Sequence, residues 1–270
     1  MLGPVTDASG VVFAAQTPPS RIVSLIPSIT ETLFALGLGD AIAGVTIFCV
    51  EPRQGVVGKA KVGGQKNPKL DLIRSLKPDL VVANIEENLK EHVETLRGWG
   101  IPVFVTYPRT VWEGIEMVKE LGMVTGADAR AEEVASGLES LYRQAVSLSK
   151  ARGPVRVFCP IWRNPYMTVN RDTYMHDMIR LSGGENVFAD RPERYPQVSL
   201  EEVAVARPEV ILLPDEPYRF RTAHIADFEA FEDAPAVRDR RIHLVDGKRL
   251  CWYGPRIAEA LETLPSLLRV

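Results

Sequence analysis

Residues 128–152, DARAEEVASGLESLYRQAVSLSKAR, predict a single long helix around which the rest of the chain is organised. Asp128 is the expected N-cap, acidic residues follow in the first turn, and Lys150 and Arg152 stand at the other end, as the helix dipole favours. Apolar residues recur along one face at Val134, Leu138, Leu141, Tyr142, Ala145 and Leu148. A helix of about 24 residues is roughly 36 Å long, enough to join two small domains. The alternative is a long helix packed on one domain.

Two segments on either side of this helix resemble each other. Residues 70–83, LDLIRSLKPDLVVA, align without a gap on residues 200–213, LEEVAVARPEVILL. Each predicts a short helix, a basic-Pro-acidic turn and a buried strand. Chance similarity is the alternative, but two copies flanking a long helix favour two related lobes with a cleft between them.

Short apolar runs alternate with helical patterns in both halves, which predicts mainly parallel sheets. Strands are expected at residues 21–26, 41–48, 80–83, 101–106, 155–161, 210–213 and 241–245, after an N-terminal hairpin or edge strand. Capping-box spacing marks helix starts at Ser28 and Ser199, Asp172 is expected to cap another helix, and a last helix is expected to run from Cys251 to Leu268.

The sequence therefore predicts an α/β fold of two Rossmann-like lobes with parallel sheets. The N-terminal lobe is expected at residues 1–127, the bridging helix at residues 128–152 and the C-terminal lobe at residues 153–270. The ligand is expected in the cleft between the lobes.

The composition is that of a globular protein, with 46% apolar and 25% charged residues. A net charge of -3 offers no basic face, so we expect no nucleic-acid partner. No apolar run approaches the roughly 20 residues that span a bilayer. Residues 1–7 lack the basic and apolar regions of a signal peptide, so the chain is expected to be cytoplasmic or a mature form without its leader.

Metal and catalytic motifs are not found in the sequence. Cys49, Cys159 and Cys251 lie far apart outside any C-x-x-C pair, and the four histidines show no ligand spacing. The sequence also lacks the G-x-S-x-G, H-E-x-x-H and P-loop patterns. We expect no catalytic residue, no metal ligand and no covalent cofactor.

The chain resembles the ABC-transporter substrate-binding proteins whose lobes are bridged by one rigid helix, the helical-backbone metal receptor group. The stretches that carry the resemblance are RIVSL at 21–25, PSITET at 27–32, LKPDLV at 76–81, GGENVF at 183–188 and YPQVS at 195–199. The resemblance extends over residues 21–268, and the group includes binders of cobalamin, ferric siderophores and haem. It implies a receptor that captures a metal chelate for an importer and catalyses no reaction. The resemblance also implies a location outside the cytoplasm, either free in the periplasm or anchored to the membrane.

The resemblance also implies a protein partner. In this group an acidic residue at the tip of each lobe pairs with basic residues of the permease subunits. Asp71 and Glu201 occupy the matching positions, which are equivalent in the internal repeat. The alternative is that both are ordinary first-turn acids stabilised by the helix dipole. The chain itself is expected to be a monomer.

Loops after the strands are expected to form the ligand site. Cobalamin binders line the cleft with aromatic rings, and the resemblance matches such positions to Phe48 and Tyr195. Aromatic rings offer flat contact area, and arginines pair with carboxylates or phosphates. The residues expected to contact the ligand are Phe48, Gln65, Lys66, Asn84, Glu86, Tyr107, Arg109, Trp162, Arg163, Tyr166, Tyr195, Tyr218, Trp252 and Tyr253.

Alternatives exist for several of these residues and for the function. Trp162 and Trp252 would fit a lobe core equally, and Arg109 and Arg163 would fit a solvated loop. The same fold could serve in the cytoplasm as a sensor or carrier of a chelate or small anion. An enzyme working in the cleft is the third function, and the missing catalytic motifs disfavour it.

Overall fold

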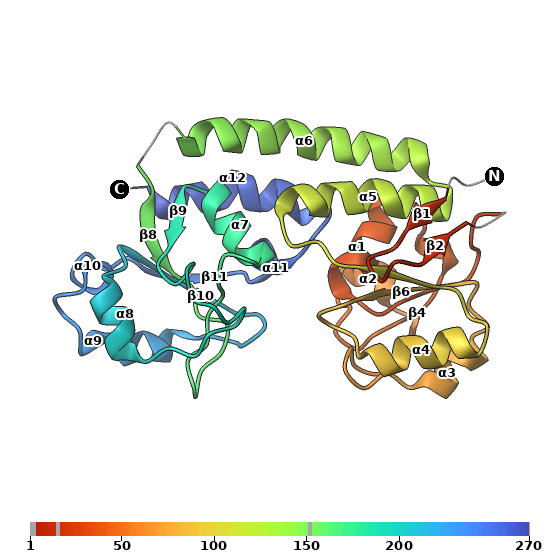
Figure 1. Cartoon of the computed structure of the whole chain (residues 1–270), viewed down its shortest axis with the longest axis horizontal. Coiled ribbons are helices and arrows are strands. Elements are labelled where there is room, and N and C mark those ends of the chain that lie inside the picture. Colours follow the sequence, from red (N-terminus) through yellow and green to blue (C-terminus); the bar gives the residue numbers. More distant parts are fainter. Residues whose placement is uncertain (1–3, 15–16, 151–152, 270) are drawn as a thin grey trace. The chain divides into compact units, whose positions relative to one another are not determined.

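The computed structural model of the chain describes residues 4–14, 17–150 and 153–269 (Figure 1). The chain divides into two compact units. Unit 1 comprises Met1–Pro108, Glu113–Leu138 and Tyr253–Pro255, and unit 2 comprises Arg109–Trp112, Glu139–Trp252 and Arg256–Val270.

Unit 1 is built on a five-stranded parallel sheet in the order β5-β4-β3-β6-β7. Its strands are β3 (Ile22–Ser24), β4 (Ile42–Val45), β5 (Ala60–Lys61), β6 (Leu80–Asn84) and β7 (Val103–Thr106). Its helices are α1 (Pro27–Ala35), η1 (Gly39–Ala41), α2 (Arg53–Val56), α3 (Leu70–Ser75), α4 (Lys90–Gly98) and most of α5 (Val111–Thr125). The central strands β3 and β6 are buried along their whole length, as expected of parallel strands covered on both faces.

Unit 2 is built on a four-stranded parallel sheet in the order β11-β10-β8-β9. Its strands are β8 (Val155–Phe158), β9 (Gly184–Asn186), β10 (Val210–Pro214) and β11 (Ile242–Val245). Its helices are α7 (Tyr174–Leu181), α8 (Leu200–Ala206), η2 (Thr222–Ile225), α9 (Ala226–Glu229), α10 (Pro235–Arg238), α11 (Lys248–Cys251) and α12 (Arg256–Leu268). The predicted α/β fold with two parallel sheets is confirmed.

The long helix is α6 (Asp128–Lys150), a single helix of 23 residues. Asp128 is its first helical residue rather than its N-cap, and Arg152, the expected closing residue, lies outside the described residues. The helix contributes residues 128–138 to unit 1 and residues 139–150 to unit 2.

The internal repeat is confirmed in three dimensions. α3 and α8 each lead into a central strand through a basic-Pro turn, and the basic residues Lys77 and Arg207 both have a φ of 49°. A positive φ is uncommon for residues with a side chain, so its recurrence at equivalent positions argues against chance similarity.

A clamp between helix and sheet also recurs in the two copies. Arg21, just before β3, donates from Nε to the Leu76 carbonyl at the end of α3, at 2.8 Å. Arg156 on β8 donates from Nη2 to the equivalent Ala206 carbonyl, at 2.6 Å. Because the last carbonyls of a helix have no partner within it, each arginine satisfies an otherwise unbonded acceptor and holds its helix to the neighbouring strand.

Two of the predicted helix starts are wrong, that of α1 by two residues and that of α7 by one. α1 begins at Pro27 with Ile26 as N-cap and no side-chain cap, because proline needs no N–H partner in the first turn and fixes a helical φ. Thr173, rather than Asp172, caps α7 and accepts from the His176 N–H at 3.3 Å. The capping box of Ser199 is confirmed.

The C-terminal helix and one strand also differ from expectation. The stretch from Cys251 does not form one helix, because Gly254 adopts a φ of 73° and Pro255 follows it, so α12 begins at Arg256. Strand β9 was not predicted, since Gly184–Asn186 is short and polar and is defined by its pairing with β8.

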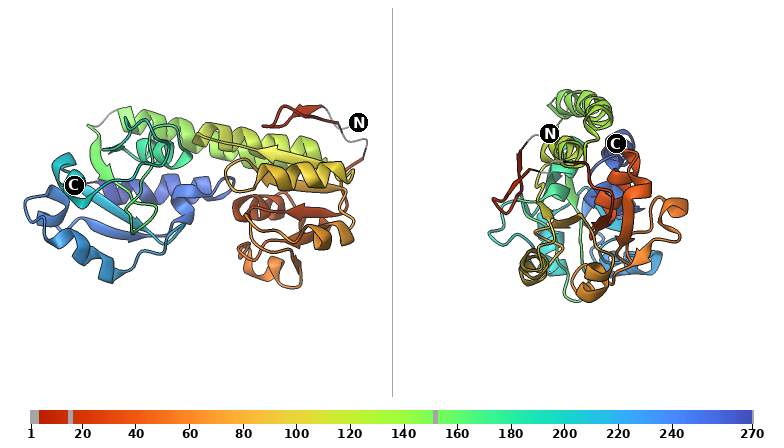
Figure 2. Two further views of the ribbon diagram at one scale, coloured as in Figure 1. Left: turned by 60° about the horizontal axis from the view of Figure 1, so that its bottom comes forward. Right: turned by 90° about the vertical axis from the view of Figure 1, so that its right-hand side faces the viewer.

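The predicted N-terminal hairpin is confirmed as β1 (Val5–Thr6) paired antiparallel with β2 (Val12–Phe13), which lies at the periphery of unit 1 (Figure 2). The Ala8 N–H donates to the Val105 carbonyl at 2.8 Å, and Asp7 Oδ2 accepts from the Val105 N–H at 3.1 Å. Because β7 is the last strand of its sheet, the hairpin covers an edge that would otherwise be open to pairing.

Replacing Gly137 with alanine is expected to raise the free energy of unfolding by about 0.5–1 kcal/mol, measured by urea denaturation. Gly137 is exposed in the interior of α6, and an added Cβ would meet nothing within 4 Å. Gly122→Ala is the matched control on a helix, because its Cβ would lie 2.3 Å from the Ala131 Cβ and should destabilise the protein. A destabilised Gly137→Ala variant would contradict the expectation.

Candidate functional site

In unit 1, exposed apolar side chains gather on the loops after the carboxyl ends of β4 and β6. Ile47, Phe48 and Val50 are 55%, 53% and 45% exposed, and Ile85 is 44% exposed. Ligands of open α/β sheets bind at this edge, and grouped exposed apolar side chains mark an interaction surface. Only Phe48 was predicted from the sequence, although the other three are also apolar residues close behind a strand, which is the signal that could have marked them.

Polar contacts hold two loops of this edge together. The Lys66 ammonium donates to the Glu86 carbonyl, and Asn88 donates from Nδ2 to the Gln65 carbonyl at 3.0 Å. A Cβ at Gly64 would lie 2.4 Å from Asn67 Oδ1 and 3.3 Å from the Phe48 ring, so the glycine lets the loop pack closely against both side chains. Gln65, Lys66 and Glu86 therefore take part in fixing the loops beside Phe48.

Asn84, at the end of β6, is only 1% exposed. Its Oδ1 accepts from the Glu86 N–H at 2.9 Å, and its Nδ2 donates to Thr106 Oγ1 at 3.2 Å. Asn84 thus shapes the loop that carries Glu86. In the same unit, Tyr107 is half-buried and Tyr253 is 6% exposed. Ligand contact by Asn84, Tyr107 and Tyr253 stays a prediction.

In unit 2, an aromatic cluster lies on the loops after β8 and β10. Trp162 is 45% exposed and meets Tyr218 edge to face, with ring centroids 5.5 Å apart. Tyr218 in turn packs on Phe220 at 4.8 Å. This exposure is inconsistent with a core position for Trp162, which presents an aromatic surface supported from one side by Tyr218.

The positive charge of Arg163 is balanced by an ion pair with Asp227. It donates to Asp227 from Nε at 2.6 Å and from Nη2 at 3.0 Å, and the Tyr166 hydroxyl donates to the same carboxylate. The hydrogen bonds from Arg163 hold the pKa of Asp227 below its usual value, while burial and Asp227 raise the pKa of Tyr166. Arg163 and the buried Tyr166 therefore tie the Trp162 loop to α9. Asp227 was not predicted, because nothing local links it to a residue 64 positions earlier.

Replacing Asp227 with asparagine is expected to lower the free energy of unfolding at pH 7 by about 2 kcal/mol, because Arg163 loses its charged partner. A lowered folded pKa stabilises the protein above the unfolded value of about 3.9, and this contribution is lost as the pH falls through the folded pKa. The difference in free energy of unfolding between variant and wild type, measured by urea denaturation, should therefore be smaller at pH 3 than at pH 7. Asp40→Asn, at an exposed position, is the control. An equal difference at both pH values would contradict the expectation.

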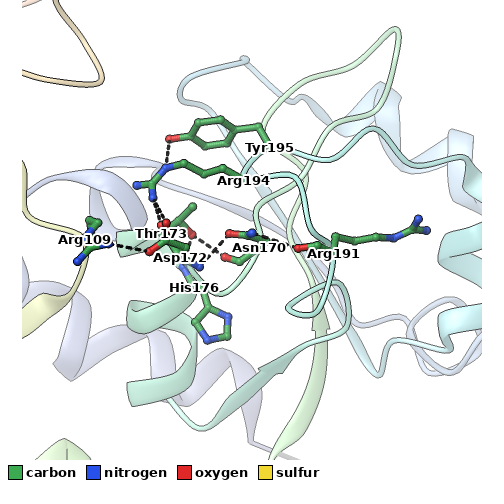
Figure 3. A network of polar contacts seen from close by, with 8 residues as sticks. All are labelled: Arg109, Asn170, Asp172, Thr173, His176, Arg191, Arg194 and Tyr195. Atoms are coloured by element: carbon green, nitrogen blue, oxygen red, sulfur yellow. Dashed lines mark hydrogen bonds and ion pairs between the residues drawn. The ribbon is translucent and has the colours of Figure 1, made fainter.

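Arg109 takes part in a network of polar contacts at the start of α7 (Figure 3). Asp172 lies between two arginines: Oδ1 is 3.2 Å from Arg109 Nη1, and Oδ2 is 2.9 Å from Arg194 Nη1. The Arg194 guanidinium also lies over the ring of Tyr195, 5.7 Å from its centroid, and Tyr195 is 40% exposed. Arg109 is 46% exposed, so it is a paired surface residue rather than an isolated one in solvent.

Hydrogen bonds of Asn170 and Thr173 fix the turn that carries Asp172. Asn170 Oδ1 accepts from the Asp172 N–H at 2.8 Å, and its Nδ2 donates to the Arg191 carbonyl at 3.1 Å. Thr173 Oγ1 donates to the Asn170 carbonyl at 2.9 Å. Figure 3 shows these residues supporting the Arg109–Asp172–Arg194 group.

Trp252 is 5% exposed and belongs to the interior of unit 2. Its Nε1–H donates to Glu216 Oε2 at 2.9 Å, and Lys248 and Arg256 lie over its ring at 5.6 and 5.8 Å from the centroid. Burial raises the pKa of Glu216. Of the two tryptophans with a possible core position, only Trp252 has one.

The two expected docking acids lie at equivalent places. Asp71 is exposed in the first turn of α3, and Glu201 is exposed in the first turn of α8. Hydrogen bonds from its own backbone amide and from Ser199 lower the pKa of Glu201, which keeps it ionised.

Residues 4–14, 17–150 and 153–269 contain no group of three His, Cys, Asp or Glu side chains arranged to hold a metal ion. Within the same ranges, every helix is too short or too polar to span a bilayer.

Comparison with known proteins places this arrangement in a family. The sequence profile of the periplasmic binding protein family matches residues 22–248. An ABC transporter substrate-binding lipoprotein of Bacillus subtilis strain 168 is 30% identical over 275 residues, 97% of this chain and 84% of the relative. A vitamin B12-binding protein of Vibrio parahaemolyticus is 30% identical over 202 residues, 73% of this chain and 71% of the relative.

Solved structures agree with the sequence comparison. The periplasmic vitamin B12-binding protein of Vibrio cholerae has a TM-score of 0.83 at 26% identity, over 93% of this chain and 97% of that one. A periplasmic haem-binding protein of Roseiflexus sp. RS-1 has a TM-score of 0.82 at 27% identity, over 92% and 97% of the two chains. The chain therefore belongs to the periplasmic binding protein family, whose members are substrate-binding transport proteins and not enzymes.

Proposed function

We propose that the chain is the receptor of an ABC importer and captures a metal chelate, namely a corrinoid, haem or ferric siderophore, outside the cytoplasmic membrane. The observation that carries this proposal is that each unit has an exposed apolar or aromatic surface at the carboxyl ends of its parallel strands. The surface of unit 1 consists of Phe48 and its neighbours, and the surface of unit 2 consists of Trp162 with Tyr218. Relatives named as vitamin B12-binding and haem-binding proteins support the ligand class.

The chemistry of the two surfaces suits such a ligand. Flat conjugated rings gain contact area on aromatic side chains, and Trp162 is held in place by its edge-to-face contact with Tyr218. Lys66 and Arg109 lie on loops of the same strand edges and offer charge to carboxylate or phosphate groups on the rim of a chelate. The chain holds and releases the chelate without breaking a bond, and it works as a monomer.

A binding screen tests the proposal. The purified chain is titrated with cobalamin, cobinamide, haem and several ferric siderophores, with tryptophan quenching and thermal unfolding as readouts. At a hundredfold excess over its Kd, a ligand stabilises the protein by about 2.7 kcal/mol, which such a screen detects. Trp162→Phe should remove most of the quenching by a bound chelate. If no chelate binds, the proposal fails.

Small anions are the second candidate ligand, because Arg109 and Arg194 flank Asp172 at an exposed position. Citrate and inorganic phosphate therefore belong in the same screen. Binding of these anions alone would replace the chelate assignment.

Permease subunits are the proposed protein partner, with Asp71 and Glu201 as the contacts. Both are exposed in the first turn of equivalent helices, where basic side chains of a partner can reach them. The double variant Asp71→Lys with Glu201→Lys should keep chelate binding and lose uptake by the importer. Uptake at the wild-type level would contradict this docking role.

A further inference from the structure

Strand β11 forms an edge of the sheet in unit 2. It pairs with β10 on one side and is the last strand of its sheet on the other (Figure 1). Its sequence is Ile-His-Leu-Val, without the lysine or proline that commonly keeps edge strands from pairing with other chains. The edge strands β5 and β9 have two and three residues, whereas β11 has four.

The internal repeat identifies the counterpart of this edge in unit 1. Val105 on β7 lies opposite Ala83 of β6, and Leu244 on β11 lies opposite Leu213 of β10. Ala83 and Leu213 are aligned in the gapless repeat. Val105 and Leu244 are therefore equivalent residues of equivalent edge strands.

Unit 1 covers this edge with its own N-terminal hairpin. The Val105 carbonyl accepts from the Ala8 N–H at 2.8 Å, and the Val105 N–H donates to Asp7 Oδ2 at 3.1 Å. Arg97 Nη2 holds the same carboxylate at 2.6 Å, and Val105 is 3% exposed. Three groups thus close the edge at Val105, namely a backbone N–H, a carboxylate and a cation that binds the carboxylate.

The backbone of Leu244 has no such cover. The Ile211 N–H donates to the Arg241 carbonyl at 3.0 Å, and the Asp215 N–H donates to the Val245 carbonyl at 3.2 Å. Because successive residues of a parallel strand bond alternately to its two sides, the N–H and C=O of Leu244 point away from β10. Neither group has a hydrogen-bond partner among the residues that the structure describes, and Leu244 is 46% exposed.

A groove of about 570 Å³ lies at this edge and is lined by Leu244 and by the segment 219–222. Arg219 and Arg221 are exposed in its lining, and neither forms an ion pair within the described part of the chain. They lie at the same groove as Leu244 and can bind a carboxylate there, as Arg97 does beside Val105. The lining does not include Trp162 or Tyr218, so the groove is distinct from the proposed ligand surface.

The other charges of the groove have partners around the start of α11. Asp215 accepts from the Gly247 N–H at 2.8 Å, and Asp246 accepts from the Lys248 N–H at 3.0 Å. The Lys248 ammonium lies over the Trp252 ring, 5.6 Å from its centroid. The lining as a whole holds three cations and two carboxylates, so it favours an anionic occupant.

We propose that the open edge of β11 binds an extended acidic segment of another protein, which adds a strand to the sheet of unit 2. A backbone N–H of the segment bonds to the Leu244 carbonyl, a carboxylate accepts from the Leu244 N–H, and Arg219 and Arg221 bind the acidic side chains. In strand addition the main-chain hydrogen bonds provide affinity and the neighbouring side chains provide selectivity. A second copy of the chain is disfavoured, because it would bring its own arginines to the same groove. This site goes beyond the capture of a chelate and does not depend on it.

Hydrogen exchange of the labelled full chain, followed by NMR, tests the edge directly. In the chain alone, the Leu244 amide should exchange much faster than the amide of its equivalent Val105. The probe is the acetylated peptide amide Thr-Val-Asp-Val-Asp-Val-Thr. At five times its Kd it should slow the exchange of Leu244 about sixfold and leave Val105 unchanged. Protection that does not include Leu244 would overturn the inference.

The charge of the segment is tested with the counterpart peptide Thr-Val-Asn-Val-Asn-Val-Thr, which should bind about fivefold more weakly. Arg219→Gln with Arg221→Gln should abolish this difference. Arg53→Gln with Lys90→Gln is the matched control, because it removes two positive charges at exposed positions of unit 1 and should keep the difference. Equal binding of the two peptides to the wild type would overturn the inference, and so would a difference that survives the loss of both groove arginines.

The strand edge is tested with Leu244→Glu, which places a like charge beside the acidic peptide and should weaken its binding about tenfold. Val205→Glu on α8 is the control, since Val205 is 82% exposed and lies outside the groove. Wild-type affinity of a folded Leu244→Glu variant would overturn the inference.

Two further measurements separate this site from other occupants and from the proposed function. If the concentrated chain dimerises in sedimentation and dimerisation protects the Leu244 amide, the occupant is a second copy and the inference fails. The chelate found in the screen should bind equally well with and without saturating peptide. Competition between them would place the peptide on the ligand surface and overturn the inference. Chelate binding without any peptide binding would overturn the inference and leave the proposed function standing.

Discussion

Replacing Asp7 with alanine is expected to lower the free energy of unfolding by about 3 kcal/mol. The Asp7 side chain is fully buried, and Oδ2 accepts from Arg97 Nη2 at 2.6 Å and from the Val105 N–H at 3.1 Å. Oδ1 accepts from the backbone N–H groups of Ser9 and Val11 at 2.9 and 3.0 Å. Alanine would leave the Arg97 charge and these donors without their acceptor, and it would loosen the hairpin from β7.

Urea denaturation measures this loss, and two variants bracket it. Ser9→Ala removes one hydroxyl donor to Asp7 and should cost about 1 kcal/mol. Asp40→Ala removes an exposed carboxylate and should change the stability by less than about 0.5 kcal/mol. A double-mutant cycle with Arg97→Ala isolates the coupling of the ion pair. A loss no larger than that of Ser9→Ala would show that the hairpin does not depend on Asp7.

Replacing Trp162 with alanine is expected to weaken chelate binding about hundredfold, equivalent to about 2.7 kcal/mol. Trp162 is the most exposed aromatic side chain of its cluster, and Tyr218 supports it from the side. Alanine removes the indole contact area and the edge-to-face contact with Tyr218. Isothermal titration with the chelate found in the screen measures the effect.

Three controls separate contact from folding. Trp162→Phe keeps a ring and should lose about tenfold or less in affinity. Trp252→Phe removes a buried indole and its hydrogen bond to Glu216, so it should lower stability more than affinity. Thermal unfolding of Trp162→Ala without ligand should match the wild type within a few degrees. Unchanged affinity in a folded Trp162→Ala variant would exclude Trp162 from the site.

Much of the fold could be predicted because its signals are local. The period of apolar residues marks α6, and the gapless repeat marks α3 with β6 and α8 with β10. The features that were not predicted depend either on a strand that is distant in sequence or on an adjacent residue that starts the helix at another position. Strand β9 exists through its pairing with β8, and Pro27 displaced the expected cap at Ser28.

The candidate site was less predictable because exposure depends on three-dimensional packing. Trp162 and Trp252 both follow strands or turns near prolines, yet one is exposed and the other is buried between Lys248 and Arg256. Arg163 has the chemistry of a ligand contact, and only the fold brings Asp227 to it. The sequence therefore shows which loops carry these residues better than it shows which of their side chains are exposed.

The recurring Arg21 and Arg156 clamps also bear on how this chain came to exist. They are what a duplicated half-length ancestor would leave behind, since a bond that holds a helix to its sheet is needed in both copies. The outward positions have diverged, with Arg74 and Ser75 in one copy against Ala204 and Val205 in the other. If these faces contact the permease as proposed, a permease made of two different subunits would bind the chain in a single orientation, whereas a permease of identical subunits would meet two unlike faces.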